Sequence, residues 1–213
     1  MKRIGVLRVV TSTDRAFLEM HQRLIQAVHP GVTFETRCLP DQPNGIHNAA
    51  TLAHALPQIE ALAAEWAPSL DGLIVSCAAD PGLGRLKAML PIPTVGAGEA
   101  CCAKVLSLGI RIGAIGIEPD APAVFHACLG DRLLRYRQPH GVRCTHDIHT
   151  EAGRQAIIAA VKRLEADGAD AVALACTGMA TTDVAALVAP FTALPVANPV
   201  LAAGEAMIAR LSV

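Results

Sequence analysis

Two cysteines, Cys77 and Cys176, stand in matching surroundings in this 213-residue sequence. Each ends an apolar, β-prone run that begins after an aspartate, and each is followed by small residues and a glycine. A thiol acts as a base or nucleophile in its thiolate form, and a helix N-terminus lowers the free-cysteine pKa of about 8.5. Matching positions before predicted helices therefore indicate two reactive thiols. The alternative is that both cysteines only fill the ends of buried strands.

Two equivalent thiols suit one reaction in particular. One thiolate removes a proton from carbon, and the other thiol returns a proton to the opposite face. N–H donors hold the intermediate enolate, as in an oxyanion hole. This reaction is racemisation without a cofactor. Pyridoxal chemistry is not indicated, because none of the lysines lies in a convincing Schiff-base loop.

The elements that must position these thiols alternate along the chain. Short β-prone runs separated by longer helical patterns predict βαβ crossovers and a parallel sheet covered by helices. An apolar fraction of 52% with 3% aromatic residues suits this α/β class. The expected strands are 3–10, 33–39, 72–76, 94–96, 111–117, 133–138, 171–175 and 196–198, and the expected helices are 14–28, 49–66, 83–89, 99–107, 121–129, 150–167, 183–188 and 201–211.

The order of elements after the first cysteine is repeated after the second. A short helix, a β-prone run opened by a proline, a loop with Gly or Pro and another helix follow each cysteine. We expect a single unit of two intertwined, pseudo-symmetric Rossmann-like halves, approximately residues 1–98 with the C-terminal helix and residues 99–200. Ligands bind beyond the carboxyl ends of parallel strands, so the repeat predicts an active site in the cleft between the halves.

Residues beside the predicted strand ends are candidates for binding a substrate. The side chains of Ala78, Ala79, Thr177 and Gly178 are small, so a carboxylate or carbonyl can approach their N–H groups closely. Hydroxyls after the first strand and the turn-rich loop after the second strand add further candidates. These are Thr11, Ser12 and Asn44.

A second stretch, HGVRCTHDIH at 140–149, is rich in residue types that bind metals. Its spacing matches no standard zinc module and the repeat does not echo it, so we favour an exposed or pocket-lining loop and expect no metal. Whether this stretch binds metal or substrate through His140, Cys144, His146 or His149 stays open.

Three motifs resemble the Asp/Glu/hydantoin racemase superfamily, above all its hydantoin and allantoin racemase branch. They are Cys-x-x-Asp-Pro-Gly at 77–82, VGAGEA at 95–100 and LACTGM at 174–179, and the similarity spans nearly the whole chain. The resemblance implies that Cys77 and Cys176 are the two acid/base groups and that neither metal nor cofactor is needed. It also implies substrate contacts from the N–H groups of the four small residues that follow these cysteines.

This sequence differs from the usual motifs of the superfamily at two places that bear on the identity of the substrate. The hydantoin branch usually has Asn-Pro-Asn-Thr/Ser after its first strand, where this sequence has RVVTSTD at 8–14. The amino-acid racemase branch usually has Asn-Thr after its first cysteine, where this sequence has Ala78-Ala79. The resemblance therefore favours a hydantoin-like ring over glutamate or aspartate. A cis-trans isomerase of the same superfamily, and a non-catalytic ligand-binding or thiol-redox module, remain alternatives.

The charge and hydropathy of the sequence indicate which classes of partner the protein can bind. The net charge is −1 and the charges are scattered, which gives no indication of a nucleic-acid-binding face. The start of the chain does not match a signal peptide, and three prolines interrupt the long apolar run at 184–204. We therefore expect a cytoplasmic protein that binds neither nucleic acid nor a membrane. We also expect a homo-oligomer whose partner is a small molecule with a carboxylate or ring carbonyl.

Overall fold

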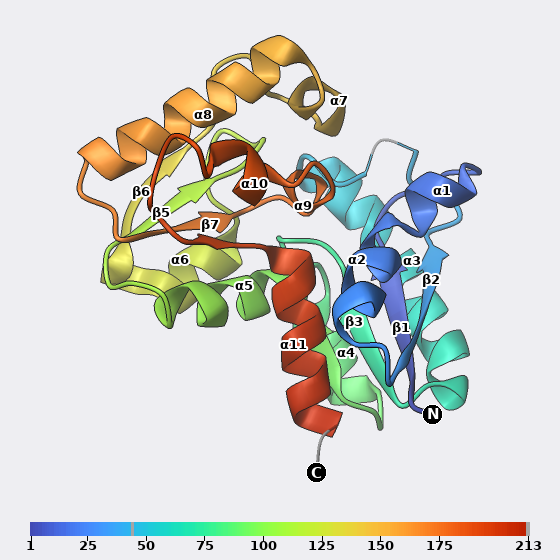
Figure 1. The fold of residues 1–213 in the computed structure, drawn as a ribbon. Helices are drawn as coiled ribbons and strands as arrows, with labels where there is room; N and C mark the ends of the chain where they lie inside the picture. Colours follow the sequence, from blue (N-terminus) through green and yellow to red (C-terminus); the bar gives the residue numbers. More distant parts are fainter. Residues whose placement is uncertain (44, 212–213) are drawn as a thin grey trace. The chain divides into compact units, whose positions relative to one another are not determined.

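The computed structural model describes residues 1–43 and 45–211. The chain divides into two compact units. The first consists of Met1–Ala97 together with the described residues from Ala203 on, and the second consists of Gly98–Ala202. Each unit contains one four-stranded parallel sheet with helices packed against it (Figure 1).

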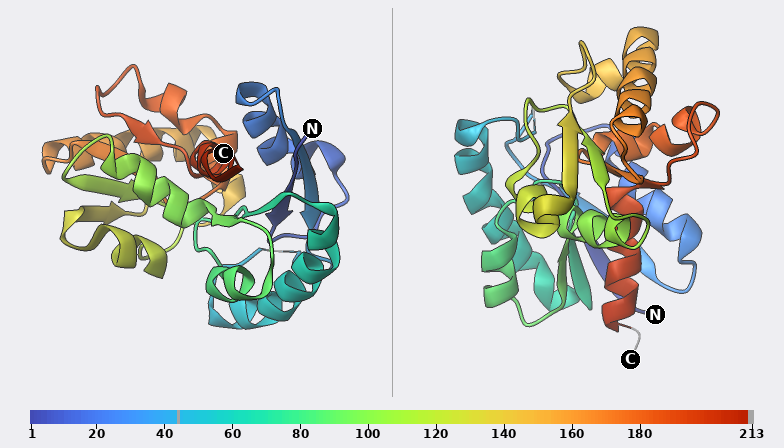
Figure 2. Two further views of the ribbon diagram at one scale, coloured as in Figure 1. Left: turned by 90° about the horizontal axis from the view of Figure 1, so that it is seen from below. Right: turned by 90° about the vertical axis from the view of Figure 1, so that its left-hand side faces the viewer.

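The sheet of the first unit has the strand order β2-β1-β3-β4, and every neighbouring pair is parallel. The helices α2 and α3 lie on opposite faces of this sheet (Figure 2). The elements are β1 (Arg3–Arg8), α1 (Arg15–Leu18), α2 (Met20–Val28), β2 (Thr33–Cys38), α3 (Ala49–Trp66), β3 (Gly72–Val75), α4 (Leu83–Met89) and β4 (Thr94–Gly96).

The second unit has the corresponding order β6-β5-β7-β8, again with parallel pairs throughout. The equal orders confirm the predicted α/β fold with two pseudo-symmetric parallel sheets. The elements are α5 (Ala97–Leu106), β5 (Ile112–Ile115), α6 (Ala123–Leu129), β6 (Leu133–Arg137), α7 (Thr145–Ile148), α8 (Glu151–Ala166), β7 (Ala171–Leu174), α9 (Gly178–Thr181), α10 (Val184–Val188), β8 (Val196–Ala197) and α11 (Pro199–Leu211).

The inner strands form because they are apolar on both faces. Every residue of β3, β5 and β7 is buried, as expected for parallel strands covered by helices on both sides. In the first unit, Trp66 and Ile59 of α3 belong to the same core as Leu73 of β3. In the second unit, Ile157 and Leu164 of α8 belong to the core that contains β5 and β7.

The two boundaries between the units fall within helices, because α5 starts at the end of the first unit and α11 ends in it. The last turns of α11 pack on the first sheet. The sulfur of Met207 lies 2.5 Å from the position that a Cβ on Gly72 would occupy. Arg210 Nη1 also donates a hydrogen bond of 3.1 Å to the Thr94 carbonyl.

One predicted helix is interrupted. Residues 14–28 form α1 and α2, with a break at Glu19. The guanidinium of the buried Arg8 donates hydrogen bonds to the carbonyls of Phe17 and Leu18, at 3.2 Å for the second. These carbonyls lie at the break, so the arginine competes with the helix for its acceptors. Among the described residues, no helix has the length and apolar character to span a bilayer.

Candidate active site

The two cysteines occupy equivalent positions in the two sheets. Cys77 follows the last residue of β3 by two positions, and Cys176 follows the last residue of β7 by two positions. Both strands hold the same place in their sheets, with β3 between β1 and β4 and β7 between β5 and β8. Both side chains are thiols, and both are of intermediate burial. Each therefore lies at the carboxyl end of an inner parallel strand, where ligands bind in such sheets.

A tight turn connects Cys77 to α4. The Cys77 carbonyl accepts a hydrogen bond of 3.1 Å from Asp80 N, and the Asp80 carbonyl accepts one of 3.2 Å from Leu83 N. Asp80 and Gly82 have positive φ angles of 48° and 70°, so the chain makes a tight turn before α4 begins at Leu83. The helix α4 begins at the predicted residue, and this turn separates it from the Cys77 thiol.

The same turn explains the glycine that ends β4. A Cβ on Gly96 would lie 2.3–2.5 Å from the three carboxyl atoms of Asp80, a distance that real Cβ atoms do not tolerate. Asp80 is 9% exposed, so its carboxylate fills the space beside β4. Asp80 also has left-handed backbone geometry, which costs about 1–2 kcal/mol for a residue with a side chain. Strain of this kind is concentrated at functional sites.

Cys176 stands closer to a helix, but its pKa is not lowered. Thr177 is the N-cap residue of α9, which begins at Gly178. Burial raises the pKa of the Cys176 thiol, the N–H groups of Gly178 and Met179 oppose the shift, and the Glu118 carboxylate adds to it. The prediction of a lowered pKa is therefore wrong for this cysteine. Because α9 has only four residues, its dipole is short and burial dominates.

Two side chains that were not predicted to belong to the site, Thr145 and Tyr136, lie near Cys176. A Cβ on Gly178 would lie 2.8 Å from Thr145 Cγ2, 3.1 Å from Thr145 Oγ1 and 3.4 Å from Cys176 Sγ. Tyr136 donates a 2.7 Å hydrogen bond to the Glu118 carbonyl, and burial raises its pKa, so the phenol stays neutral. Only Thr145 lies in a stretch that the sequence had singled out, and no periodicity or motif indicated that it would approach the thiol.

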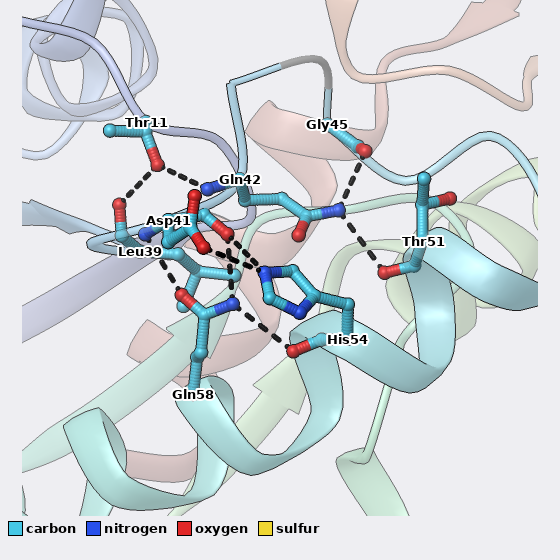
Figure 3. Close-up of polar contacts among 8 residues, drawn as sticks. All are labelled: Thr11, Leu39, Asp41, Gln42, Gly45, Thr51, His54 and Gln58. Carbon is cyan, nitrogen blue, oxygen red and sulfur yellow. Dashed lines mark hydrogen bonds and ion pairs between the residues drawn. The ribbon is translucent and has the colours of Figure 1, made fainter.

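Two predicted substrate-binding residues, Thr11 and Ser12, follow β1 and use their hydroxyls within the fold. Thr11 Oγ1 donates to the Leu39 carbonyl at 2.7 Å and accepts from Gln42 N at 2.5 Å (Figure 3). Ser12 Oγ accepts from Asp14 N at 3.1 Å. The two Thr11 contacts join the loop that follows β1 to the segment that follows β2. The third candidate from these loops, Asn44, lies outside the described residues.

The loop after β2 is held on α3 by a polar network (Figure 3). Gln42 is 3% exposed, and its Nε2 donates to the carbonyls of Gly45 at 2.7 Å and Thr51 at 3.1 Å. Asp41 Oδ2 lies 3.0 Å from His54 Nε2, and the Asp41 N–H donates to Gln58 Oε1 at 2.9 Å. These contacts tie Asp41 and Gln42 to the helix α3.

The stretch 140–149 forms the loop and short helix that precede α8. The Asp147 carboxylate accepts hydrogen bonds from the N–H groups of Arg143 at 2.8 Å and Cys144 at 3.0 Å, and these N–H groups lower its pKa. Asp147 therefore organises the start of α7. Within residues 1–43 and 45–211, no three His, Cys, Asp or Glu side chains gather closely enough to hold a metal ion.

A buried polar pair lies immediately before Cys77. His21 Nδ1 is 2.8 Å from Ser76 Oγ, and the two residues are 1% and 3% exposed. Burial, and secondarily the charge of Arg8, hold the pKa of His21 well below its ordinary value of 6.5. The folded protein therefore contains this histidine in its neutral form near neutral pH.

The His21 shift predicts a loss of stability in acid. Below pH 6.5 the unfolded chain binds a proton at His21 and the folded chain does not. The free energy of unfolding therefore decreases as the pH is lowered, by about 1.4 kcal/mol per pH unit, until the pKa of His21 in the folded chain is reached. The free energy of unfolding from urea titrations at pH 7.5 to 4.5 measures this slope. His21→Asn is expected to be less stable at pH 7.5 and to have the shallower slope. His47→Asn, at an exposed position, should keep the wild-type slope, and equal slopes in all three proteins would contradict the prediction.

Comparisons with known proteins agree with this arrangement. The model of the family described as Asp/Glu/Hydantoin racemase matches residues 4–207. A hydantoin racemase from Paenarthrobacter aurescens is 28% identical over 156 residues, which cover 70% of this chain and 64% of that protein. The chain thus matches less than two thirds of this relative.

Two solved allantoin racemases have the same fold. The enzyme from Klebsiella pneumoniae superposes with a TM-score of 0.84 at 21% identity, covering 100% of this chain and 89% of that one. The enzyme from Pseudomonas fluorescens gives 0.85 at 21% identity, covering 99% and 92%. The resemblance found in the three sequence motifs is thereby confirmed.

Proposed function

Because the chain belongs to the Asp/Glu/hydantoin racemase family, we propose that it is a cofactor-independent racemase or epimerase with Cys77 and Cys176 as its two acid/base groups. One observation supports this proposal above the others. The two thiols follow equivalent inner strands by the same number of residues, in two sheets of the same strand order. Two unrelated core cysteines have no physical reason to share this placement.

The proposed reaction exchanges one proton on a carbon next to a carbonyl. The thiolate of one cysteine takes the proton, the C–H electron pair moves into an enolate, and the thiol of the other cysteine protonates the opposite face. The raised pKa of Cys176 suits this thiol to the acid role in the resting protein, with Cys77 as the base. After inversion the two protonation states are reversed, and the opposite enantiomer is then the substrate.

We propose a hydantoin-like ring as the substrate class, such as a 5-substituted hydantoin or allantoin. The names of the curated relative and of the two similar structures support this class. In this proposal the N–H groups of Ala78, Ala79, Thr177 and Gly178 hold substrate oxygens, since their side chains leave the backbone accessible. Thr11 and Ser12 contribute by fixing the loop after β1, because their hydroxyls already have partners.

Deuterium wash-in at the stereocentre tests the function. Each enantiomer of a 5-substituted hydantoin, and of allantoin, is incubated with the protein in D2O, with and without EDTA, and the uncatalysed exchange is subtracted. We expect one deuteron per inversion, no effect of EDTA, and slower exchange with glutamate and aspartate. The absence of catalysed exchange on every substrate, or full activity of a Cys77→Ala, Cys176→Ala double variant, would overturn the proposal. A covalent adduct on either cysteine, detected by mass spectrometry, would instead indicate a cis-trans isomerase.

A further inference from the structure

We propose that Thr145 is a further catalytic residue beside Cys176, and that its hydroxyl donates a hydrogen bond to the substrate oxygen that becomes negative as the proton leaves carbon. This inference rests on the proposed racemase function and adds to it a side-chain donor that the family motifs in this sequence do not contain. The observations that carry it all come from the second unit, at the junction of α7 and α9.

The first observation is the place of the hydroxyl. A Cβ atom placed on Gly178 would lie 3.1 Å from Thr145 Oγ1 and 3.4 Å from Cys176 Sγ. The hydroxyl and the thiol therefore border the same small volume beside the backbone of Gly178. A substrate whose reacting carbon lies at the thiol brings its adjacent carbonyl oxygen into the neighbourhood of this hydroxyl.

The second observation is that the fold does not use this hydroxyl. Thr145 is the first residue of α7, whereas the capping position belongs to Cys144, whose N–H donates to Asp147. Within the described parts of the chain, Thr145 Oγ1 has no hydrogen-bond partner. Three nearby threonines bond their hydroxyls to backbone carbonyls of the same segments: Thr150 to Asp147, Thr181 to Gly178 and Thr182 to Met179. The Thr145 hydroxyl can therefore donate to a bound substrate without giving up a hydrogen bond within the fold.

The third observation is that α7 is held firmly. Ile148 at its end is fully buried in the core of the second unit. The Asp147 carbonyl accepts a 2.8 Å hydrogen bond from Thr150 Oγ1 and lies only 1.9 Å from the position that a Cβ on Gly153 would occupy. This close contact between α7 and α8 leaves Thr145 little freedom to move away from the thiol. A donor held in advance of the reaction is what electrostatic stabilisation of an enolate requires.

The difference between a carbonyl oxygen and an enolate oxygen determines how loss of the Thr145 hydroxyl should affect kcat and KM. A carbonyl oxygen accepts a hydrogen bond weakly, and the enolate oxygen formed from it accepts one strongly. The Thr145 hydroxyl therefore stabilises the transition state more than the bound substrate. Its removal lowers kcat more than it raises KM.

The test compares Thr145→Val, which removes the hydroxyl at nearly constant shape, with Thr145→Ser, which keeps it. We expect the valine variant to lose about 10–100-fold in kcat for deuterium exchange, with KM within about threefold of wild type. The serine variant is expected to stay within about threefold of wild type in both constants. Thr192→Val is the matched control, because Thr192 Oγ1 accepts a hydrogen bond from Leu194 N within its own loop. It should leave kcat unchanged.

A second readout separates this role from a direct effect on the thiol. The pH dependence of Cys176 alkylation, followed by mass spectrometry without substrate, is expected to be the same in wild type, Thr145→Val and Thr145→Ser. A shifted profile in the valine variant would mean that the hydroxyl acts on the thiolate, and would overturn the proposal. A valine variant as active as wild type, or a serine variant as poor as the valine one, would also overturn it.

The outcomes distinguish this inference from the function on which it rests. Wild-type exchange that depends on both cysteines, together with an unaffected Thr145→Val variant, overturns only the role of Thr145. A wild-type protein that catalyses no exchange overturns both. If Thr145→Val does not fold, Thr145→Ala removes the same hydroxyl with a smaller side chain, and the same expectations apply to it.

Discussion

Replacing either Cys77 or Cys176 by serine is expected to lower racemisation by about 10²–10⁴-fold in both directions. Each inversion in the proposed mechanism needs a base on one face and an acid on the other, so losing one thiol stops the turnover of both enantiomers. A serine hydroxyl is a far weaker acid than a thiol and cannot act as the base near neutral pH. Circular dichroism of each pure enantiomer over time measures the rate.

Cys128→Ser provides the matched control for these variants. Cys128 is an exposed free cysteine of α6, and the same chemical change there should leave the racemisation rate within about twofold of wild type. A Cys77→Ser or Cys176→Ser variant that racemises as fast as the control would contradict the two-thiol mechanism.

Gly153→Ala is expected to reduce the free energy of unfolding by about 1–3 kcal/mol. The new Cβ would meet the Asp147 carbonyl at 1.9 Å and its carbon at 2.9 Å, and both are backbone atoms that cannot rotate away. The contact between α7 and α8 must therefore open. Urea unfolding measures the change. Because α7 also carries Thr145, racemisation should fall as well in the protein that remains folded.

Gly84→Ala is the control for this substitution. Gly84 lies within the helix α4, and a Cβ there would meet no atom within 4 Å. The same Gly-to-Ala change should therefore be neutral or stabilise the protein by up to about 1 kcal/mol through helix propensity. Equal effects of the two substitutions would show that the close approach of α7 to α8 does not limit stability.

The repeated pattern around the cysteines was sufficient to predict the fold. Apolar runs ending in Cys77 and Cys176 are buried on both faces, and such strands are recognisable without tertiary information. The helices α3 and α4 were predicted with the bounds Ala49–Trp66 and Leu83–Met89 that the structure has. Long periodic segments and clear helix stops made these assignments possible.

The surroundings of Cys176 could not be predicted in the same way. The helices α7 and α9 have four residues each, which is too short for any periodicity to appear. The approach of Thr145 to the thiol depends on the missing side chain of Gly178, a tertiary contact that a single sequence does not encode in its local pattern. The raised pKa of Cys176 likewise follows from burial, whereas its place before a helix suggested the opposite direction.

Proton–deuterium exchange of each pure enantiomer, measured with each single Cys→Ser variant, tests the central claim most directly. A variant that retains one thiol can still remove the proton on the face which that thiol reaches. We predict that Cys77→Ser exchanges the α-proton of one enantiomer, that Cys176→Ser exchanges that of the other, and that neither variant inverts its substrate. Equal exchange of both enantiomers by one variant would contradict the two-thiol mechanism and indicate a single base.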